Sequence, residues 1–311
     1  VSEARKLADE LGCEVTGLLL GDNVEGIAKE LGGYGADKVL VCDSPLLKDY
    51  TTDAYAKVVC DMVNEYKPEV LLIGATNIGR DLGPRCAARL HTGLTADATH
   101  LDIDTAKYID FLKESSTIDL SKQKFDMEDR NLKMTRPAFG GHLMATIICP
   151  RFRPQMSTVR PGVMKKAPFD QAKADACQIV KPAFSLTAED IKTEVLSVEK
   201  AAEKLVDLIG ADVIVSVGRG ISKDVNKGIE LAEQLAAALG GGVVGASRAV
   251  TDAGWMTADH QVGQTGKTVH PKIYVALGIS GAIQHTAGMQ DSECILSLIH
   301  ISEPTRPLYI S

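Results

Sequence analysis

The sequence has 311 residues, 45% of them hydrophobic, which is enough apolar material for the cores of two ordinary domains. Its formal net charge of -7 and isoelectric point near 5.6 exclude nucleic acid and anionic membranes as principal partners, because both would require a basic surface. No stretch approaches the roughly 20 apolar residues of a membrane span, and the start lacks a basic-then-apolar signal, so we expect a cytoplasmic protein that meets small molecules or other proteins.

The first half of the chain predicts short strands that alternate with helices. The predicted strands are 15–20, 38–41 and 70–74. The predicted helices are 3–11, with Ser2 as the N-cap, 23–31 and 52–66. Strands separated by helices are typical of a parallel sheet with crossover helices, so we expect an α/β domain.

A polar, glycine-bearing segment follows the third of these strands. Residues 75–85 form the predicted turn, and a helix is expected only from Cys86 to Leu90. Because open α/β sheets bind ligands at the carboxyl ends of their strands, the turn is a candidate contact for a ligand or a partner. A loop that only starts a helix fits the same residues, and both interpretations stay open.

A charge-rich segment from 103 to 133 lacks a clear apolar period, which indicates an insertion or hairpin on the first domain. A strand is predicted at 145–149. Arg151, Arg153 and Arg160 follow it. They could form a phosphate site or an inter-subunit contact, although an exposed loop is the interpretation that we favour.

A change of composition marks the predicted domain boundary. Residues 167–196 mix prolines, polar residues and short apolar stretches, as a linker does. We expect an N-terminal α/β domain over 1–196, a second α/β domain over 197–296, and a tail over 297–311 that we interpret as non-native. In the second domain the predicted helices are 198–209 and 224–239, and the predicted strands are 213–217, 243–245 and 272–277.

The cysteines and histidines predict neither a disulfide framework nor a metal site. The seven cysteines are an odd number and lack CxxC spacing, so we expect free thiols. No Ser/His/Asp arrangement and no metal-ligand spacing occurs, and we therefore predict no catalytic residue.

Two loops of the second domain carry an arginine at the end of a predicted strand. Gly218-Arg219-Gly220 follows the strand 213–217, and Ser247-Arg248 follows 243–245. Glycine lets the backbone approach a ligand, and a guanidinium can pair with phosphate oxygens in a bidentate manner. Either loop alone would be an ordinary tight turn. Since both strands end at one edge of a parallel sheet, we expect the two arginines to meet in one crevice.

The segment from Gln261 to Thr268 has the appearance of a phosphate-binding P-loop. That motif requires a glycine where Gln261 stands, and it must open a helix, whereas His270-Pro271 leads into a strand. We therefore predict no ATP or GTP hydrolysis, and interpret the segment as a polar loop that offers amides and a hydroxyl to a flat heterocycle. Its candidate binding residues are Gln261, Val262, Gly263, Gln264, Thr265 and Gly266.

A run of small residues follows the strand 272–277 and opens a predicted helix. The Ser280 hydroxyl and the free amides that follow it predict an anion-accepting helix start. A histidine such as His285 is usually a core residue, yet a titratable ring near Arg248 would also suit negative charge on a bound ring. The candidate binding residues are Ser280, Gly281, Ala282, Ile283, Gln284 and His285.

These loops together resemble the electron-transfer flavoprotein alpha subunit. The motifs that carry the resemblance are Gly218-Arg219-Gly220, GASR at 245–248, QVGQTGK at 261–267 and GISGAIQHTAGMQDS at 278–292. The resemblance covers nearly all of 200–296, and GLTAD at 93–97 and Pro161-Gly162 extend it to the first domain. It implies two Rossmann-like parallel-sheet domains, of which the C-terminal one binds FAD, and an electron carrier rather than a conventional enzyme.

The resemblance also implies a role for each loop. Arg219 and Ser247 would hold the phosphate or ribityl part of FAD, while Arg248 would lie over the isoalloxazine and favour its reduced, negatively charged states. Thr265 and Gln264 would hydrogen-bond the ring near N5 and the neighbouring carbonyl. The residues 280–285 would bind the dinucleotide, with the histidine near the pyrimidine carbonyl at C2.

The partners that the resemblance implies are an electron-transfer flavoprotein beta subunit and redox enzymes of the acyl-CoA dehydrogenase type, as in fatty acid beta-oxidation, or NADH as an electron source. The family continues past 296 with an Asn-Lys-Asp segment that completes the FAD site, and Ile299 stands where that Asn would fall, which predicts weaker FAD binding. The segments 103–133 and 160–166 are similar to alpha subunits of anaerobic bacteria, some of which divide electron pairs between two acceptors.

Two other functions stay open on the sequence alone. A nicotinamide-dependent dehydrogenase or transhydrogenase subunit of similar topology would need a general acid or base, for which the second domain offers only His260, His270 and His285. A purely structural subunit with vestigial loops would be colourless after purification, whereas a flavoprotein would be yellow.

Overall fold

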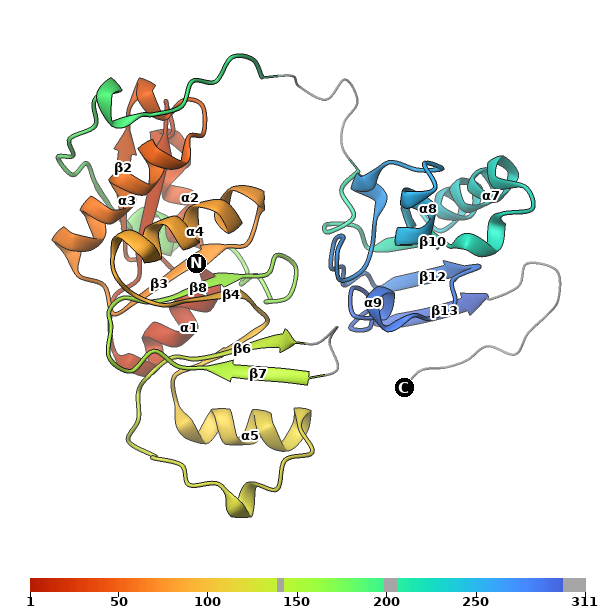
Figure 1. Cartoon of the computed structure of the whole chain (residues 1–311), viewed down its shortest axis with the longest axis horizontal. Coiled ribbons are helices and arrows are strands. Elements are labelled where there is room, and N and C mark those ends of the chain that lie inside the picture. Colours follow the sequence, from red (N-terminus) through yellow and green to blue (C-terminus); the bar gives the residue numbers. More distant parts are fainter. Residues whose placement is uncertain (139–142, 199–205, 299–311) are drawn as a thin grey trace. The chain divides into compact units, whose positions relative to one another are not determined.

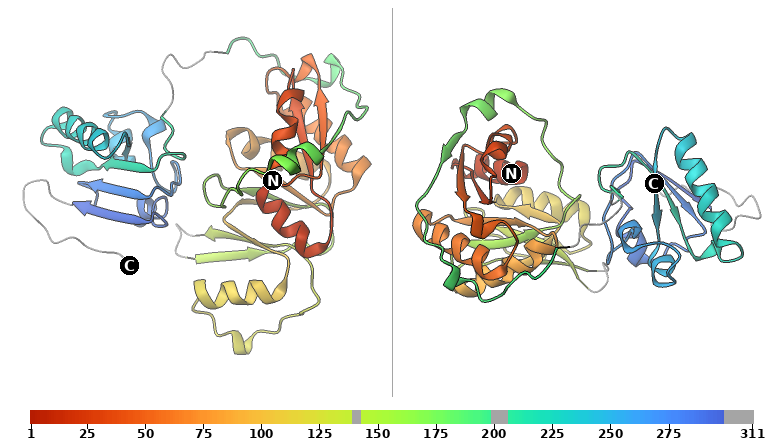
Figure 2. Two further views of the ribbon diagram at one scale, coloured as in Figure 1. Left: turned by 180° about the vertical axis from the view of Figure 1, so that it is seen from behind. Right: turned by 90° about the horizontal axis from the view of Figure 1, so that it is seen from above.

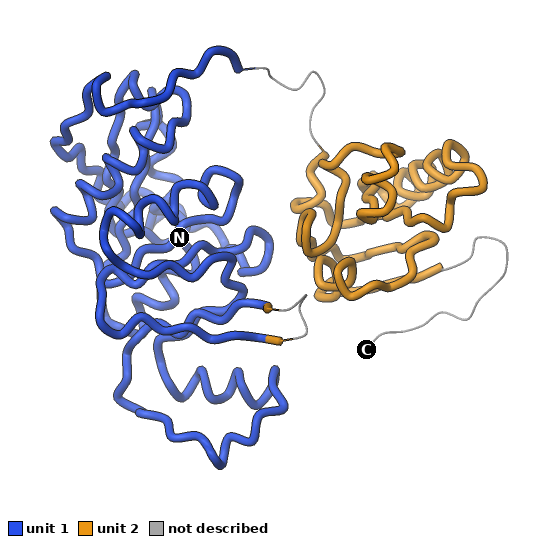
Figure 3. The backbone as a smooth tube through the Cα atoms, viewed as in Figure 1, with its two compact units in different colours: residues 1–137, 144–198 blue, residues 138–143, 199–311 orange. Residues whose placement is uncertain are grey.

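The computed structural model describes residues 1–138, 143–198 and 206–298. By its internal contacts the chain divides into two units (Figure 3): unit 1 comprises residues 1–137 and 144–198, and unit 2 comprises residues 138–143 and 199–311. No helix among the described residues is long and apolar enough to cross a membrane. All seven cysteines, which lie within the described residues, are free thiols.

Unit 1 contains two three-stranded parallel sheets, in the orders β1-β2-β9 and β3-β8-β4 (Figure 1). The strands are β1 (Thr16–Gly21), β2 (Lys38–Asp43), β3 (Val70–Gly74), β4 (Leu94–Ala98), β8 (Gln155–Val159) and β9 (Gln178–Val180). The helices are α1 (Ser2–Leu11), α2 (Ala28–Gly33), α3 (Thr52–Tyr66), α4 (Asn77–Arg89) and α6 (Gln171–Ala176). The predicted α/β class with parallel sheets is confirmed.

Helices cover both faces of the sheet that contains β3 (Figure 2). Leu71 of β3 packs against the cluster that holds Leu82 of α4. Its neighbour Leu72 packs on the opposite face, against the cluster that holds Leu7 of α1. Successive side chains of a strand point to opposite faces, so a continuous apolar strand of this kind is stable only when both faces are covered.

The structure corrects the prediction for residues 75–85, most of which are helical. α4 begins at Asn77, because the Thr76 hydroxyl accepts a hydrogen bond from the Gly79 amide at 3.2 Å and so caps the helix. A Cβ at Gly79 would lie 1.8 Å from the Gly74 carbonyl oxygen, so this tight strand-to-helix turn requires glycine. The helix has no clear apolar period, because it contains glycines, polar residues and the internal Pro84.

The exposed loop expected from Arg151 onwards is wrong for residues 155–159. These residues form β8, the central strand of its sheet, and Gln155, Ser157 and Thr158 are each at most 2% exposed. The Ser157 hydroxyl donates to the Thr95 carbonyl at 3.1 Å, and the Gln155 side-chain oxygen accepts from a neighbouring amide at 2.9 Å. The strand was missed because its buried polar groups are satisfied internally.

Three smaller differences concern the ends of predicted elements. Ser2 does not cap α1; its hydroxyl accepts from the Ala167 amide at 3.1 Å, and Val1 stands at the cap. The predicted linker 167–196 contributes α6 and β9 to unit 1. The strand predicted at 145–149 runs two residues earlier, from Leu143 to Ile147.

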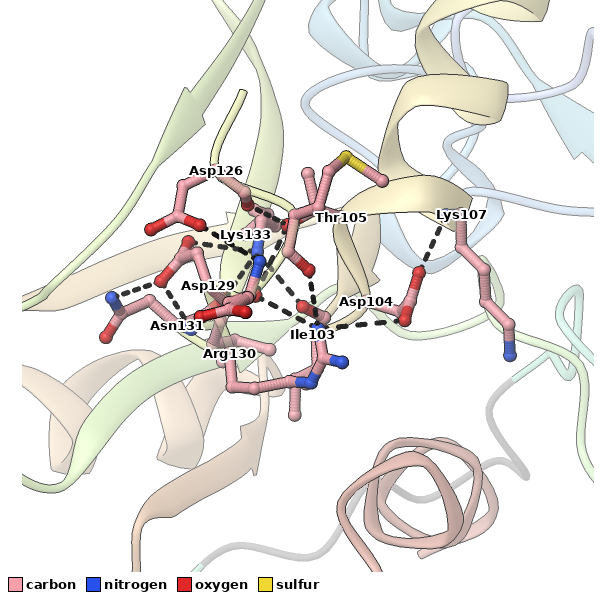
Figure 4. A network of polar contacts seen from close by, with 12 residues as sticks. Ile103, Asp104, Thr105, Lys107, Asp126, Asp129, Arg130, Asn131 and Lys133 are labelled. Carbon is pink, nitrogen blue, oxygen red and sulfur yellow. Dashed lines mark hydrogen bonds and ion pairs between the residues drawn. The ribbon is translucent and has the colours of Figure 1, made fainter. Parts of the chain in front are cut away.

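A third sheet of unit 1, in the order β5-β6-β7, holds the segment predicted as an insertion. Its elements are β5 (His100–Asp102), α5 (Thr105–Ser115), β6 (Lys133–Ala138) and β7 (Leu143–Ile147). Lys133 fixes the segment (Figure 4): its ammonium donates to the carbonyls of Ile103, Asp129 and Asn131 at 3.0, 3.3 and 3.1 Å. It also pairs with the Asp129 carboxylate at 3.1 Å, and its side chain is only 6% exposed. A buried ammonium requires such complete pairing.

Unit 2 contains one parallel sheet in the order β11-β10-β12-β13. The strands are β10 (Val213–Val217), β11 (Val243–Ala246), β12 (Ile273–Leu277) and β13 (Cys294–Leu298), and the helices are α7 (Val225–Ala238), α8 (Arg248–Asp252) and α9 (Ile283–Thr286). Val215 packs against Ala232 of α7 on one face. On the other face Tyr274 packs with Val262 and Met289, which belong to the long loops.

Two predictions at the borders of unit 2 need correction. Of the helix predicted at 198–209, residues 199–205 lie outside the described residues, and residues 206–209 are not helical. The carbonyl of Val206 instead accepts from the Lys267 ammonium at 2.7 Å. Ser297 and Leu298, assigned above to the tail, are the last residues of β13 and pair with β12. Ile299 and the rest of the tail lie outside the described residues.

Candidate functional site

Three loops meet at the carboxyl edge of the unit 2 sheet. Gly218 follows β10, Ser247 follows β11 and Gly278 follows β12. The Gly218 amide donates to the last carbonyl of β12 at 2.8 Å, and the Gly220 amide donates to the Gly278 carbonyl at 2.9 Å. The Ser247 amide donates to the last carbonyl of β10 at 2.9 Å. The loops therefore form one surface, at the edge where open α/β sheets bind ligands.

The first and third loops cross so closely that glycine is required on both sides. A Cβ at Gly218 would lie 2.3 Å from the Gly278 carbonyl oxygen, and one at Gly278 would lie 2.8 Å from the Gly220 Cα. Gly278 also has a φ of 66°, a left-handed conformation that side chains disfavour. Glycine thus lets the two loops cross here, and of these three glycines Gly220 alone is exposed.

Arg219 and Arg248 are both exposed at this edge. Arg248 pairs with Asp252 of α8 at 3.2 Å, but both side chains are more than 60% exposed. Arg219 forms no ion pair with the residues that the structure describes. Ser247 stands at the N-cap of α8 without using its hydroxyl as a cap. Both arginines and Ser247 thus belong to loops at one edge of the sheet, and the meeting of the two guanidiniums in one crevice stays a prediction.

The loop from Gln261 to Gly266 is held by main-chain bonds to both of its neighbours. The Val262 amide donates to the last carbonyl of β11 at 2.9 Å, and the Gln264 amide donates to the Gln284 carbonyl at 2.6 Å. Gly263 has a φ of 136°, and a Cβ there would lie 2.7 Å from that same Gln284 oxygen. The segment forms a turn and opens no helix, as its sequence predicts.

Within this loop, supporting residues and exposed residues separate. Gln261 is 9% exposed; its side-chain amide donates to the Thr265 hydroxyl oxygen at 2.9 Å, and its carbonyl accepts from Thr251 at 2.8 Å. Val262 and Gly263 are also buried. Thr265 and Gly266 are exposed, and Gln264 is half-buried. Because Thr265 accepts from Gln261, its own hydroxyl hydrogen stays available to a bound group.

The third loop contributes an exposed stretch of small residues. Ser280, Gly281, Ala282, Ile283 and Gln284 are all exposed. Gly281 has a φ of 74°, and a Cβ there would meet no atom within 4 Å. α9 begins at Ile283 with Ala282 at its cap, later than predicted from Ser280. The helix has four residues, so the anion-accepting groups are mainly the local amides rather than a helix dipole.

His285 differs from the other candidates because it is buried, with 7% exposed. Its Nε2 lies 2.9 Å from the hydroxyl of Tyr274, which is fully buried. Burial lowers the pKa of His285 to about 4, against a smaller opposing effect of the Val262 backbone, and burial raises the pKa of Tyr274. The imidazole is therefore neutral near pH 7. Of the two interpretations that the sequence leaves open for His285, the structure agrees with the core residue.

Two buried polar atoms next to this ring have no hydrogen-bond partner among the described residues: His285 Nδ1 and the hydroxyl of Ser216 on β10. Neither Ser216 nor Tyr274 is among the binding residues predicted from the sequence. The only signal they offered was a polar atom inside an otherwise apolar strand, in VIVSV and IYVAL. Buried polar atoms without partners are rare in folded proteins and commonly mark functional sites.

The donors at this edge suit an anionic dinucleotide. Two guanidiniums, three hydroxyls and a row of exposed amides lie on the loops of this edge. The hydroxyls belong to Ser247, Thr265 and Ser280. In the part of the chain that the structure describes, no group of three or more His, Cys, Asp and Glu side chains could hold a metal ion.

Comparison with known proteins assigns both halves of the chain. The model of the electron transfer flavoprotein domain matches residues 1–185, and that of the electron transfer flavoprotein FAD-binding domain matches residues 207–290. The chain is 72% identical over 309 residues to the "Acryloyl-CoA reductase electron transfer subunit beta" of Anaerotignum propionicum, a match that covers 99% of the chain and 84% of that protein.

Relatives named as alpha subunits are also close. The identity is 52% over 309 residues with the electron transfer flavoprotein subunit alpha of Thermoanaerobacterium thermosaccharolyticum, covering 99% of the chain and 84% of that protein. It is 51% over 298 residues with the corresponding subunit of Clostridium acetobutylicum, covering 96% and 81%. FAD is therefore the cofactor and electron transfer the function, and the chain belongs to the electron transfer flavoprotein alpha-subunit family.

Proposed function

We propose that FAD binds at the carboxyl edge of the unit 2 sheet, with Arg219 and Ser247 on its phosphate or ribityl part. The observation that carries this proposal is the exposed Arg219 guanidinium, which has no partner among the described residues and stands between Gly218 and Gly220 at the end of β10. Guanidinium forks are common donors to phosphate oxygens. When bound, FAD supplies one- and two-electron chemistry.

The loops beside this point orient the ring system in our proposal. Arg248 provides a positive charge that persists at any physiological pH and favours negative charge on the ring. Thr265 donates its free hydroxyl hydrogen near N5, and Gln264 contacts the neighbouring carbonyl. The exposed residues 280–284 bind the dinucleotide, because Gly281 leaves open space for close approach. Gln261, Val262, Gly263 and Gly266 hold the shape of the loop.

His285 acts in this proposal as a neutral hydrogen-bonding ring. Tyr274 keeps its proton at neutral pH, so it donates to Nε2 and leaves the imidazole proton on Nδ1. That N–H has no described partner and is assigned to the pyrimidine carbonyl at C2. A neutral donor supports charge on the carbonyl without a proton that is gained or lost near pH 7.

We further propose that the chain assembles with an electron-transfer flavoprotein beta subunit in the cytoplasm and exchanges electrons with an enzyme of the acyl-CoA dehydrogenase type. The relative that is 72% identical bears the name of an acryloyl-CoA reductase, which supports a partner acting on CoA thioesters. The free cysteines fit a reducing compartment. NADH as the electron source is the second proposal for the donor.

The test is FAD binding by the chain co-purified with a beta subunit, followed by flavin absorbance and by titration of the FAD-depleted complex. Arg219→Gln should weaken FAD binding about 10- to 100-fold, since charge-assisted hydrogen bonds contribute roughly 1.5–3 kcal/mol. Lys223→Gln, an exposed cation in the same loop region, is the matched control and should leave the affinity unchanged.

Two results would contradict the assignment. A complex that stays colourless with excess FAD would exclude cofactor binding at this edge. Equal loss of affinity in the Arg219 and Lys223 variants would show a general charge effect instead of a specific contact. Transfer of electrons from an acyl-CoA dehydrogenase, measured against NADH as donor in the same complex, then separates the two proposed sources.

A further inference from the structure

A cluster of three arginines surrounds a single carboxylate in unit 1. The Arg160 guanidinium donates twice to one oxygen of Asp97, through Nε at 3.1 Å and through Nη2 at 2.5 Å. Arg80 donates to the other oxygen at 3.2 Å. Arg136 is close enough to act on the same carboxylate, and its buried Nε has no hydrogen-bond partner among the described residues.

The charges of this cluster do not balance. Burial opposes ionisation of Asp97, but the hydrogen bond and charge of Arg160 and the charges of Arg80 and Arg136 hold the pKa of Asp97 below its usual value. Arg160 and Arg80 thus pair with one carboxylate, and the charge of Arg136 also acts on it. Asp97 is also held at a φ of 64°, at an irregularity between β4 and β8, and its amide donates to Thr158 at 2.8 Å. Such strained positions gather at functional sites.

The cluster lies at the carboxyl edge of the parallel sheet β3-β8-β4. Asp97 is the last residue but one of β4, and Arg160 directly follows β8. Arg80 lies in the first turn of α4, the helix that follows β3. The Ala75 amide donates to the last carbonyl of β8 at 2.7 Å, which joins the β3–α4 turn to this edge. This is the edge that binds ligands in open α/β sheets.

The β3–α4 turn adds backbone donors to the positive charge. α4 has 13 residues, and the amides of Asn77 and Ile78 in its first turn have no acceptor among the described residues. Both residues are exposed, and 55% of the Arg80 side chain is exposed beside them. Arg153, which belongs to the same segment as Arg160, pairs with Glu69 at 2.5 Å instead.

We propose that this edge of unit 1 is a phosphate-binding site, in which Arg80, Arg136 and the first amides of α4 receive the phosphate group of a small phosphorylated ligand. Arg160 and Asp97 hold the arginines in place. A guanidinium fork fits a tetrahedral oxyanion through two parallel hydrogen bonds, and free amides at a helix start complete the set of donors. All of these residues belong to unit 1.

Pyrophosphate, as a probe, tests the proposal in isothermal titrations of the full chain with saturating FAD, at constant ionic strength adjusted with chloride. Wild-type protein should bind it, and Arg80→Gln and Arg136→Gln should each weaken the binding about tenfold, as expected for loss of one charge-assisted contact. Arg85→Gln is the matched control: it lies on the same helix, is 51% exposed and also pairs with one aspartate. It should bind as wild type does.

Three results would overturn the proposal. In the first, the wild-type protein binds pyrophosphate no more tightly than it binds chloride. In the second, the wild type and all variants bind pyrophosphate equally. Alternatively, Arg80→Gln could abolish association with the beta subunit while the affinity for pyrophosphate stays unchanged, which would make the cluster a contact for a partner's carboxylate. Because the compared variants all lie in unit 1, the comparison among them holds whether or not FAD occupies unit 2.

Discussion

Units 1 and 2 both present the carboxyl edge of a parallel sheet, but they treat the charge on that edge differently. In unit 1, Arg160 and Arg80 share the carboxylate of Asp97, which is 20% exposed. In unit 2, Arg219 has no partner among the described residues, and Arg248 has only an exposed one. A guanidinium that is already paired gains less from an added anion. The free charge on the edge, and not the fold alone, therefore indicates where a dinucleotide binds most tightly.

The two units also differ in how they bury an ionisable group. In unit 1, three carbonyls and the Asp129 carboxylate pair with the buried Lys133 ammonium. In unit 2, burial lowers the pKa of His285 to about 4, so its imidazole is neutral near pH 7, and its Nδ1 has no partner among the described residues. A paired charge rigidifies a segment, whereas an unpartnered neutral atom is available to a ligand. The units should respond differently to mutation and to acid.

The largest predicted effect comes from glycine at the crossing of the unit 2 loops. Gly278→Val places a β-branched residue at a φ of 66°, with its Cβ 2.8 Å from Gly220, and should cost unit 2 about 3 kcal/mol. FAD affinity should fall about 100-fold or more. Hydrogen exchange resolved by peptide, together with FAD titration, measures both quantities in one preparation.

Gly79→Ala is the counterpart in unit 1. Its Cβ would meet the Gly74 carbonyl oxygen at 1.8 Å, so the start of α4 must shift and unit 1 should lose about 2 kcal/mol. FAD affinity should stay unchanged, because the residue belongs to the other unit. Gly281→Ala, at a φ of 74° in open space, should cost only about 1 kcal/mol. Loss of FAD in the Gly79 variant would break the contrast between the units.

Acid should destabilise unit 2 before unit 1. The pKa of His285 is about 4 in the folded protein, against an ordinary value of 6.5. Between pH 6.5 and 4, the unfolded chain therefore binds a proton at this imidazole that the folded chain does not bind. Unit 2 should lose stability as the pH falls from 6.5 to 4, by about 3 kcal/mol in all. In unit 1 the pKa values of Asp97 and Asp129 lie below 3.8, so the stability from these carboxylates is lost only below that value.

His285→Gln is the control for this prediction, since glutamine keeps a polar side chain that does not titrate. Hydrogen exchange, resolved separately for each unit, measures the stability of that unit as a function of pH. In the variant, the stability of unit 2 should stay constant between pH 6.5 and 4. If the wild type and the variant lose stability equally over this range, the buried histidine is not the cause.

The sequence predicted the elements whose apolar pattern is unbroken. The strand Val213–Val217 and the helix Thr52–Tyr66 appear within a residue of their predicted limits, because their burial dictates a clear period. β8 and residues 77–85 of α4 were missed for the opposite reason. Most of their residues are polar or small, and β8 is stabilised by partners distant in sequence, such as the Thr95 carbonyl that accepts from Ser157. Periodicity carries no information about such contacts.

The site was predictable as far as loops and residue types were concerned. Glycine and arginine after a strand indicate an anion-binding turn, and parallel topology places such turns on one edge. The sequence could not reveal that His285 is buried against Tyr274, since this depends on how the loop from Gln261 folds over the sheet. The cluster around Asp97 was equally hidden, because it joins residues from four separate elements or their ends.

The smallest predicted effect concerns the one partner that Arg248 has in the described part of unit 2. Asp252→Asn removes an exposed ion pair of 3.2 Å, so unit 2 should change in stability by less than about 0.5 kcal/mol. The freed guanidinium should strengthen FAD binding about twofold at low salt, and the gain should vanish at about 1 M salt, where the charge is screened. If Asp252→Asn weakens FAD binding instead, Asp252 positions Arg248 for the cofactor. The edge of unit 2 would then resemble that of unit 1, where a carboxylate holds the arginines in place.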